Sequence, residues 1–560
     1  MLNLHNHSNY SILQSSISID SLIAFAKNHG SNYVSLTDTN GMHGLIQFAK
    51  QAEEAGIKPI LGAYIDESNN PNDYVVFLAK NNYGYSELCK VITSRKLEED
   101  FSLIKVVQNI SDNLFVLISS LQLLKEITTS FLFPQNLYVE LIATKKQKRK
   151  TRELYNYAKE NKLQIIASHP AYFLNKEDYI LQKTVTAIKS NSTLENLDEA
   201  DIIDEEYYLK TPTEIKKIWK ALPEAIWNVE DIAKSCNVNL EFGKNKFPVF
   251  PLPKGENASS YLEQICNKGL TKRYEFVTEH ATARLAKELS VIEEMGFSHY
   301  FLVVHDIVRE AKLRQMRILG RGSAANSLVS YCLGFTEIDP IKHNLYFERF
   351  LNRARTSPPD VDLDFSWRER DEIIKYIYDK YGYDKVAMIS TTVTFRARSA
   401  FREVAKVFGV SQREISKFSK FIPWTSAKNL VQLAAKFPES KSLDFSLEPW
   451  KTIIQIASRL AGFPRHRSIH PSGIVVTEKP MTNYVPLEYA KNKGLGLIIT
   501  QADMYSIEDL GLVKIDILSQ RSLEVLTNTM RDLQEEYVSP KRTQSVKIIP
   551  INSLDENLSN

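Results

Sequence analysis

Three aspartates alternate with apolar residues in one short segment of the chain. The segment reads Pro-Pro-Asp-Val-Asp-Leu-Asp-Phe and spaces Asp360, Asp362 and Asp364 two residues apart. Successive side chains of an extended strand point to opposite faces, so the three carboxylates would share one face. Carboxylates gathered in this way repel one another and are costly to remove from water unless a cation or open solvent compensates. The pattern predicts either a solvated edge strand or a set of oxygen ligands for Mg²⁺.

A further aspartate lies far downstream, in the segment Leu-Val-Lys-Ile-Asp-Ile-Leu. If this segment is a strand, Lys514 and Asp516 share the face opposite the apolar residues between them. Taken alone, Asp516 is more typical of a surface residue in a plain ion pair with Lys514 than of a metal ligand.

A turn rich in small residues, Gly320-Arg321-Gly322-Ser323, precedes an apolar helical segment. Backbone N–H groups at a helix start, together with a hydroxyl and a guanidinium group, make a seat for phosphate. The same sequence is also an ordinary way to begin a helix. Its place shortly before the aspartate segment favours the phosphate interpretation.

The elements that must position these residues follow from the spacing of apolar side chains. Before residue 240 the pattern alternates between strands and helices, which predicts a parallel sheet or a barrel with helices outside. A stretch with three prolines, within residues 241–258, predicts a linker. The first expected elements are a helix at Ile19–His29, a strand at Tyr33–Leu36, a helix at Gly44–Ala55 and a strand at Lys58–Leu61.

Composition limits the class of protein. The chain of 560 residues is 43% hydrophobic and 24% charged, as in globular proteins with several domains. Its net charge of +3 means that any nucleic-acid surface must be local. The four cysteines form no Cys-x-x-Cys pair, which argues against a zinc ribbon and for a reducing compartment. Neither a signal peptide nor an uncharged stretch of membrane-spanning length is present, so we expect a cytoplasmic protein without a membrane partner.

From about Arg284 to Arg521 the sequence resembles the catalytic core of the bacterial DNA polymerase III alpha subunits, the C-family polymerases. One departure is that Ile318 and Leu319 stand where the family usually has Gly-Pro, which alters the entrance to the glycine turn but keeps its phosphate donors. The stretches that match in order and spacing are Met295-Gly-Phe-Ser-His-Tyr-Phe-Leu-Val-Val304, Gly320-Arg-Gly-Ser-Ala-Ala-Asn-Ser-Leu328, Phe347-Glu-Arg-Phe-Leu-Asn352, Pro359-Asp-Val-Asp-Leu-Asp-Phe365, His470-Pro-Ser-Gly-Ile-Val-Val476 and Gly511-Leu-Val-Lys-Ile-Asp516.

The resemblance implies a nucleotidyltransferase palm of the polymerase-beta type with a mixed sheet. Asp360, Asp362 and Asp516 would then hold two Mg²⁺ ions that activate the primer 3′-hydroxyl and steady the departing pyrophosphate. Asp364 would be a supporting residue. The groups that would bind the phosphates of the incoming dNTP are Arg321, Gly322, Ser323 and Lys514.

The segment from Phe395 to Lys420 is rich in basic residues. A solvated helix face explains such a run equally well, whereas the resemblance implies a mostly helical thumb that grips duplex phosphates without reading sequence. The DNA contacts expected on this basis are Arg396, Arg398, Arg402, Lys406, Arg465 and Arg467.

The start of the chain resembles a PHP domain, a (β/α) barrel that carries metal ligands in many of its members. His5 and His7 fall on one face of a strand, and Asp38 follows Thr37 as in the family. The rest of the ligand set is eroded, because Thr39 replaces a histidine, Tyr64 replaces a glutamate, and the segment 168–172 lacks both an aspartate and a histidine of the family pattern. We therefore expect the PHP metals to be absent, His5, His7 and Asp38 to hold one weakly bound ion at best, and the domain to brace the polymerase core.

The fold expected from the resemblance is multidomain α/β. The family extends well beyond 560 residues, into fingers, helix-hairpin-helix, clamp-binding and OB-fold parts, so we expect an N-terminal portion or one half of a split gene. The expected segments are a PHP-like domain at 1–240, a linker at 241–258, palm at 259–390 and 469–521, thumb at 391–468, and a start of fingers or a frayed end at 522–560.

The expected activity is DNA-directed DNA polymerisation on primer-template DNA with dNTPs. Expected protein partners are a sliding clamp, a clamp loader, a proofreading exonuclease, or a chain that supplies the fingers. Two alternatives stay open at this point: a catalytically incomplete DNA-binding or assembly module, and a PHP-type metal-dependent phosphoesterase or 3′–5′ exonuclease.

Overall fold

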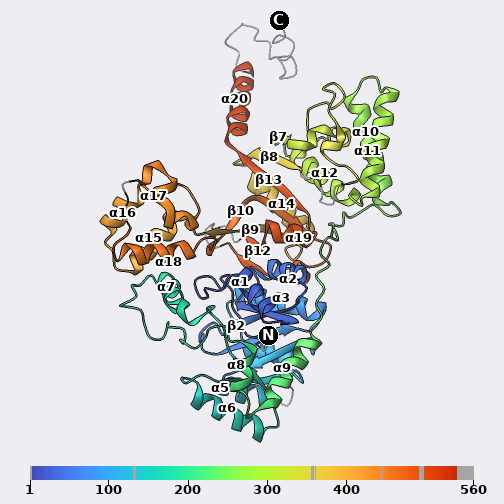
Figure 1. Ribbon diagram of the computed structural model, residues 1–560. Helices are drawn as coiled ribbons and strands as arrows, with labels where there is room; N and C mark the ends of the chain where they lie inside the picture. Colours follow the sequence, from blue (N-terminus) through green and yellow to red (C-terminus); the bar gives the residue numbers. More distant parts are fainter. Residues whose placement is uncertain are drawn as a thin grey trace.

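The computed structural model of the chain describes residues 3–129, 134–354, 359, 361–441, 443, 445–490 and 497–538. Figure 1 shows an N-terminal domain in blue to green, a central sheet in yellow to red, and helical parts on either side of that sheet. Asp360, one of the predicted metal ligands, lies outside the described residues.

The N-terminal domain is built on a six-stranded sheet in the order β1-β2-β3-β4-β5-β6. The expected strand and helix pattern of its first half is confirmed within a few residues. Its strands are β1 (Tyr33–Thr39), β2 (Lys58–Asp66), β3 (Tyr74–Ala79), β4 (Leu114–Ile118), β5 (Leu137–Ile142) and β6 (Gln164–Ser168).

The sheet is mixed, whereas the alternation of strands and helices predicted parallel pairing throughout. β3 runs antiparallel to both β2 and β4, and the other pairs are parallel. The cause is the short connection between β2 and β3, because a parallel pair needs a crossover of a dozen residues or more. Residues 5–7 bridge the two edges of the sheet: Asn6 pairs with Ala171 after β6, and its carbonyl accepts from the N–H of Thr37 in β1.

Nine α-helices accompany this sheet in the part of the domain that the structure describes. They are α1 (Ile19–Asn28), α2 (Leu45–Glu54), α3 (Asn82–Leu97), α4 (Leu103–Asn109), α5 (Leu121–Thr128), α6 (Lys148–Glu160), α7 (Tyr179–Lys189), α8 (Pro212–Ile218) and α9 (Pro223–Ser235). Residues 236–257, which are all described, contain no helix or strand, and the linker at 241–258 stays a prediction. A single bridge between Lys246 and Leu512 ties this linker to the central sheet.

The central sheet has seven strands in the order β11-β12-β9-β10-β13-β8-β7. Its order brings segments together that are far apart in the sequence, since β8 and β13 are neighbours. The strands are β7 (Ile318–Arg321), β8 (Asp362–Ser366), β9 (Val386–Thr394), β10 (Pro464–Val476), β11 (Leu487–Tyr489), β12 (Ile498–Asp503) and β13 (Lys514–Gln520).

Helices surround the central sheet, and four of them form a separate lobe between β9 and β10 (Figure 1). We call this lobe, residues 397–459, the helical lobe. It consists of α15 (Ala397–Val407), α16 (Gln412–Ser419), α17 (Leu433–Lys436) and α18 (Trp450–Arg459). The other helices are α10 (Ala258–Arg273), α11 (Glu279–Glu294), α12 (Ser298–Leu313), α13 (Leu328–Leu333), α14 (Arg370–Tyr381), α19 (Met504–Asp509) and α20 (Arg521–Val538).

The N-terminal domain and the central sheet share one hydrophobic core. The core of the N-terminal domain continues into Ile389, Val475 and Leu487 of the central sheet. Polar contacts reinforce the junction: the Tyr85 hydroxyl donates to the carbonyl of Tyr484 at 2.8 Å, and Lys50 pairs with Asp509 at 2.7 Å. The two parts are therefore packed as one unit. Among the helices that the structure describes, none has the length and apolar character needed to cross a membrane.

Candidate active site

Two aspartates that are far apart in the sequence lie side by side in the structure. β13 pairs with β8 in parallel, and the register places Asp516 directly beside Asp362. Neighbouring strands are about 4.8 Å apart, and paired residues point to the same face of the sheet. Two carboxylates at this separation can bind one divalent cation between them, and oxygen is the ligand that Mg²⁺ prefers.

The row continues on both sides of this pair. Arg321 of β7 pairs with Asp362, and Gly473 of β10 pairs with Asp516. We call these four residues, Arg321, Asp362, Asp516 and Gly473, the acidic row. It places a guanidinium group next to two carboxylates on one face of four adjacent strands.

Both oxygens of the Asp516 carboxylate have protein partners. The Ser472 hydroxyl donates to Oδ1 at 2.7 Å, and the Lys514 ammonium pairs with Oδ2 at 2.7 Å. The register of β10 shifts between Ile469 and Ile474, and Ser472 lies within this irregularity. Such bulges re-aim side chains next to active sites. Ser472 therefore orients Asp516, while Lys514 neutralises it and would have to yield Oδ2 to a cation that binds there.

His470 lies at the edge of the acidic row. Its Nδ1 accepts from the N–H of Gly473 at 2.8 Å, so the neutral ring carries its hydrogen on Nε2. Partial burial lowers the pKa of His470, and nearby Lys514 lowers it further, against the opposing effect of Asp516. His470 is thus held neutral and fixes the bend from which Ser472 reaches Asp516.

Asp364, two residues after Asp362, is almost fully buried. Burial raises the pKa of Asp364, although the Arg321 guanidinium, 3.4 Å from its Oδ1, opposes the shift. Gln520 Nε2 donates to its other oxygen at 3.4 Å. This placement fits the supporting role expected of Asp364, because it holds Arg321 at the end of the acidic row.

The glycine turn lies directly against the acidic row. A Cβ on Gly322, whose φ of +73° is a left-handed value, would lie 3.4 Å from Oδ2 of Asp362. Gly320 allows a close backbone approach, since a Cβ there would lie 1.7 Å from the carbonyl oxygen of Phe335. The turn leads into a 3₁₀ segment, Gly322–Asn326, and only then into the short α13, where the sequence predicted one helix. Ser323 is part of that segment and directly follows Gly322.

A buried ion pair on α11 holds the far end of this turn. Glu288 is fully buried; its Oε2 accepts from the Ser327 hydroxyl at 2.8 Å and from the N–H of Val329 at 3.1 Å. Its Oε1 pairs with Arg284 Nε at 3.0 Å, and Arg284 donates to the carbonyl of Asn326 at 2.9 Å. Sequence reasoning missed this pair, although a glutamate on the apolar face of a helix is a signal that could have marked it.

The basic residues expected to bind DNA fall into two groups. Arg396, Arg398, Arg402 and Lys406 lie exposed on or beside α15. Arg465 pairs with Glu403 at 2.7 Å and keeps 38% of its side chain exposed.

Arg467 differs, because its side chain is only 11% exposed. Its guanidinium group donates to the hydroxyls of Ser390 and Thr392 and to the carbonyl of Gln501. These acceptors are inside the protein, at the junction with the N-terminal domain. Arg467 is therefore not part of the exposed basic surface, contrary to the prediction.

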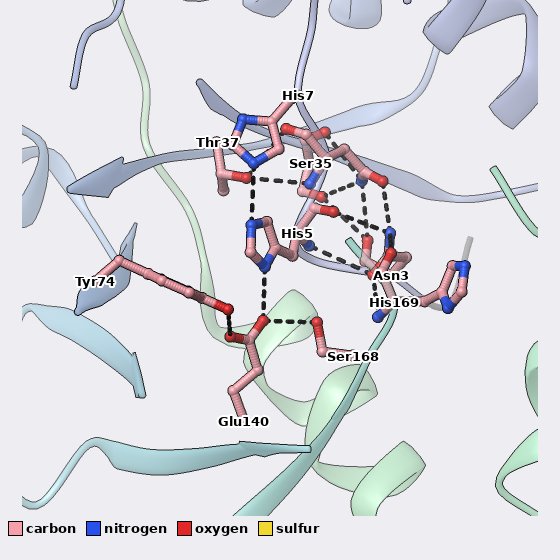
Figure 2. Close-up of polar contacts among 10 residues, drawn as sticks. Asn3, His5, His7, Ser35, Thr37, Tyr74, Glu140, Ser168 and His169 are labelled. Carbon is pink, nitrogen blue, oxygen red and sulfur yellow. Dashed lines mark hydrogen bonds and ion pairs between the residues drawn. The ribbon is translucent and has the colours of Figure 1, made fainter. Parts of the chain in front are cut away.

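A second group of potential ligands lies inside the N-terminal domain (Figure 2). His5 Nδ1 contacts Glu140 Oε1 at 2.7 Å, and its Nε2 contacts Nε2 of His7 at 3.0 Å. His7 Nδ1 contacts the hydroxyl of Ser11 at 3.1 Å, which donates to Asp38 at 2.6 Å. We call the chain Glu140–His5–His7–Ser11–Asp38 the histidine network.

Every acid and base of the histidine network is at most 1% exposed. Burial on its own raises the pKa of Glu140, but its contacts with His5, Ser168 and Tyr74 outweigh this and leave the pKa lowered. Burial lowers the pKa of His7 well below its usual value and raises that of Asp38 to about 6. His5 and His7 are hydrogen-bonded to each other through their Nε2 atoms, whereas Asp38 accepts from Ser8 and Ser11 and is linked to His7 through Ser11.

Aromatic side chains, among them Tyr64 at a family glutamate position, fill the space around the histidine network. Tyr172 stacks on His7 with ring centroids 4.1 Å apart, and Tyr64 stacks on Tyr74 at 4.3 Å. His169 points away from the His5–Glu140 pair in Figure 2, and its Nε2 bonds the carbonyl of Glu206 at 2.6 Å. Sequence reasoning missed Glu140, whose signal is a single acid within the apolar strand β5. Among the residues that the structure describes, which exclude Asp360, no group of three His, Cys, Asp or Glu is arranged to hold a metal ion.

Two family models match the chain one after the other. The PHP domain model matches residues 3–160, and the model described as the bacterial DNA polymerase III alpha NTPase domain matches residues 260–519. The first range includes the whole histidine network, and the second includes the whole acidic row. The protein is thus of the class that joins a PHP domain to a polymerase III alpha domain.

Curated relatives extend the similarity over nearly the whole chain. The DNA polymerase III subunit alpha of Bacillus subtilis is 33% identical over 96% of this chain and 50% of its own length. That of Thermus aquaticus is 30% identical over 95% and 52%, and an error-prone DNA polymerase of Symbiobacterium thermophilum is 31% identical over 95% and 52%. The chain therefore carries a PHP domain followed by a bacterial DNA polymerase III alpha domain, and it spans about half the length of the curated relatives it matches.

Proposed function

We propose that the chain is the catalytic core of a DNA polymerase that adds deoxynucleotides to a primer 3′-hydroxyl during replication. The observation that supports the proposal is the acidic row, in which Asp362 and Asp516 are in register on β8 and β13. Arg321 and Lys514 lie beside them, and this combination of paired carboxylates and cations suits phosphoryl transfer.

The described donors fit a site for divalent cations. Asp362, Asp516 and the neighbouring Asp360 would hold two Mg²⁺ ions, which, when bound, supply activation of the primer hydroxyl and charge neutralisation at the pyrophosphate. Ser472 keeps the Asp516 carboxylate in the orientation seen here. Arg321, Lys514 and the turn at Gly322 and Ser323 would neutralise and orient the triphosphate, and Glu288 would hold that turn in place from behind.

We further propose that the N-terminal domain is a brace without a metal centre. The support is the histidine network, whose acids and imidazoles are buried and bonded to protein groups. The shared core and the Lys50–Asp509 pair transmit its stability to the central sheet. Metal analysis tests this proposal: stoichiometric zinc or manganese that is lost in His5→Ala and His7→Ala would favour the phosphoesterase alternative instead.

The partners follow from the proposed reaction. They are primer-template DNA, dNTPs and other replicase subunits, namely a sliding clamp, a clamp loader and a proofreading exonuclease, and the location is the cytoplasm. Because the chain spans about half of its curated relatives, primer extension is to be measured with the chain alone and with a second chain that supplies the rest of their length.

The decisive experiment is Mg²⁺-dependent primer extension by Asp362→Asn and Asp516→Asn. Each variant should lose more than about 100-fold in rate while it still binds primer-template, because a ligand of the reacting site is lost. Asp379→Asn, an exposed aspartate that pairs with Lys375, is the matched control. Wild-type rates in either variant would refute the proposal, and DNA binding without extension in both formats would favour a non-catalytic module.

A further inference from the structure

The loop between α16 and the 3₁₀ segment that begins at Ala427 exposes two large aromatic side chains. Trp424 is 83% exposed and Phe421 is 44% exposed, whereas Ile422 between them is fully buried in the core of the helical lobe. Exposed tryptophan is unusual in a folded protein, since burying its indole would stabilise the fold. Nothing in the role of the acidic row accounts for it.

The backbone of this loop is fixed at several points. The carbonyl of Phe421 accepts from the Ser440 hydroxyl at 2.7 Å, and that of Thr425 accepts from the N–H of Ala397 at 3.0 Å. Ser426 also forms an antiparallel bridge with Arg396. The loop is therefore an ordered platform, and little conformational entropy is lost when a partner packs on Trp424.

The platform lies at the base of the helical lobe, among cations. Arg396 lies between the end of β9 and the start of α15. Its bridge to Ser426 therefore places the loop at the junction of the helical lobe with the central sheet. Arg398 Nε donates to the carbonyl of Ile422 within the loop itself. The basic residues between Phe395 and Leu430 are Arg396, Arg398, Arg402, Lys406, Arg413, Lys417, Lys420 and Lys428, against two acids, Glu403 and Glu414.

One of these two acids is already neutralised within the protein. Glu403 pairs with Arg465 at 2.7 Å and with Lys406 at 3.5 Å. The segment that contains Trp424 is thus strongly basic, and Arg396 and Arg398 lie directly against the loop, although the whole chain carries a net charge of only +3. A partner that offers regular negative charge and flat apolar faces fits such a surface, and a DNA strand with unpaired bases has both.

We propose that Trp424 is a stacking platform for an unpaired base of a DNA strand, whose phosphates are bound by the surrounding arginines and lysines. This inference rests on the proposed function and adds a contact to it: the strand would be the single-stranded part of the template or primer. Trp424 provides stacking, Phe421 extends the apolar surface, and Arg396, Lys420 and Lys428 supply the charge. Stacking on an aromatic ring is tolerant of sequence, as a polymerase requires.

The test measures DNA binding by the whole chain in EDTA, without dNTP, so its result is independent of the chemistry at Asp362 and Asp516. Fluorescent primer-template with a single-stranded overhang is compared with a blunt duplex of the same length. Trp424→Ala should weaken binding to the overhang substrate roughly fivefold or more, and binding to the blunt duplex by less. Trp424→Phe, which keeps a ring, should stay within about threefold of wild type.

Two further variants separate stacking from charge and from non-specific effects. Trp227→Ala removes an indole that is 61% exposed on α9 of the N-terminal domain, and it should leave binding unchanged. Lys420→Gln should lower the slope of log K against log salt by about 1, whereas Trp424→Ala should leave that slope unchanged. A loss below fivefold for Trp424→Ala on the overhang, or an equal loss on the blunt duplex, would overturn the proposal.

Discussion

The N-terminal domain and the central sheet both bring acidic and basic side chains together from distant segments, with opposite outcomes. In the histidine network, Glu140, His5, His7 and Asp38 are at most 1% exposed, and hydroxyls or imidazoles of the protein occupy their polar atoms. In the acidic row, Asp362 and Asp516 stand side by side, and Arg321 keeps 47% of its side chain exposed.

The difference shows that residue type alone does not make a metal or catalytic site. A ligand must be aimed at a point that a substrate or ion can reach, and its protein partners must be able to give way. Lys514 keeps 16% of its side chain exposed and would have to leave Asp516 for a cation to bind there. Glu140 cannot turn away from His5 in the same way, because several buried polar groups would then lose their hydrogen-bond acceptor. The same residue types therefore stabilise the fold in one region and, on the function proposed above, take part in chemistry in the other.

The largest expected effect is a loss of folding stability when the histidine network is disrupted, and its absence would contradict the comparison. Glu140→Ala leaves His5, Ser168 and Tyr74 without their acceptor in a buried site, so we expect a loss of about 3–5 kcal/mol. The measurement is the midpoint of thermal unfolding, followed by circular dichroism. Mn²⁺ binding at the acidic row should be unchanged at temperatures where the variant is folded.

The control for this variant is Glu153→Ala in the same domain. Glu153 forms an exposed pair with Arg149 on α6, and such pairs contribute about 0–1 kcal/mol. An unchanged midpoint for Glu140→Ala would show that the network does not stabilise the domain. A large upward shift of the wild-type midpoint with zinc or manganese, absent in His5→Ala, would show that it still binds metal.

A prediction of intermediate size uses pH to probe a buried histidine of the N-terminal domain, His169. Burial lowers the pKa of His169 to about 3, whereas an unfolded histidine has a pKa of about 6.5. The folded protein therefore binds fewer protons, and stability is lost as the pH falls from about 6.5 towards 3. Each pH unit costs about 1.4 kcal/mol, so the loss at pH 5 should be about 2 kcal/mol.

The pH effect is isolated by comparison with His169→Gln, which keeps a donor for the carbonyl of Glu206. Between pH 7.5 and pH 5 the thermal midpoint of wild type should fall more than that of the variant. Asp38 acts in the opposite sense, because its raised pKa of about 6 favours the folded state on acidification, but it is present in both proteins. Parallel curves for the two proteins would show that His169 is protonated without cost.

The sequence predicted the main features of both regions, and its failures have physical causes. Alternation in β8 and β13 predicted that Asp362 and Asp516 point out of apolar strands, but only the strand order of the sheet puts them in register. Arg467 was grouped with the basic surface because a run of charges does not reveal which member turns inward. Ser472 was missed because its contact depends on a bulge in β10; Pro471 and Gly473 are signals of a bulge, but they do not reveal which side chain it aims.

The smallest expected effect is a change in Mn²⁺ affinity when Ser472 is replaced. The hydroxyl of Ser472 orients Asp516 in the acidic row. Ser472→Ala leaves Asp516 able to bind a cation but no longer holds its carboxylate in one orientation. The loss of such a supporting hydrogen bond to a metal ligand typically costs 10–100-fold in affinity, and we expect about 10-fold here because Lys514 still contacts the other oxygen.

The Mn²⁺ dissociation constant, measured from the electron paramagnetic resonance signal of the free ion, reports this directly and requires no polymerase activity. Ser468→Ala, on the same strand but opposite Thr391 of β9, is the matched control and should bind Mn²⁺ as wild type does. Equal affinity in Ser472→Ala and wild type would mean that the strand register alone positions Asp516, and the acidic row would then need no support beyond the sheet.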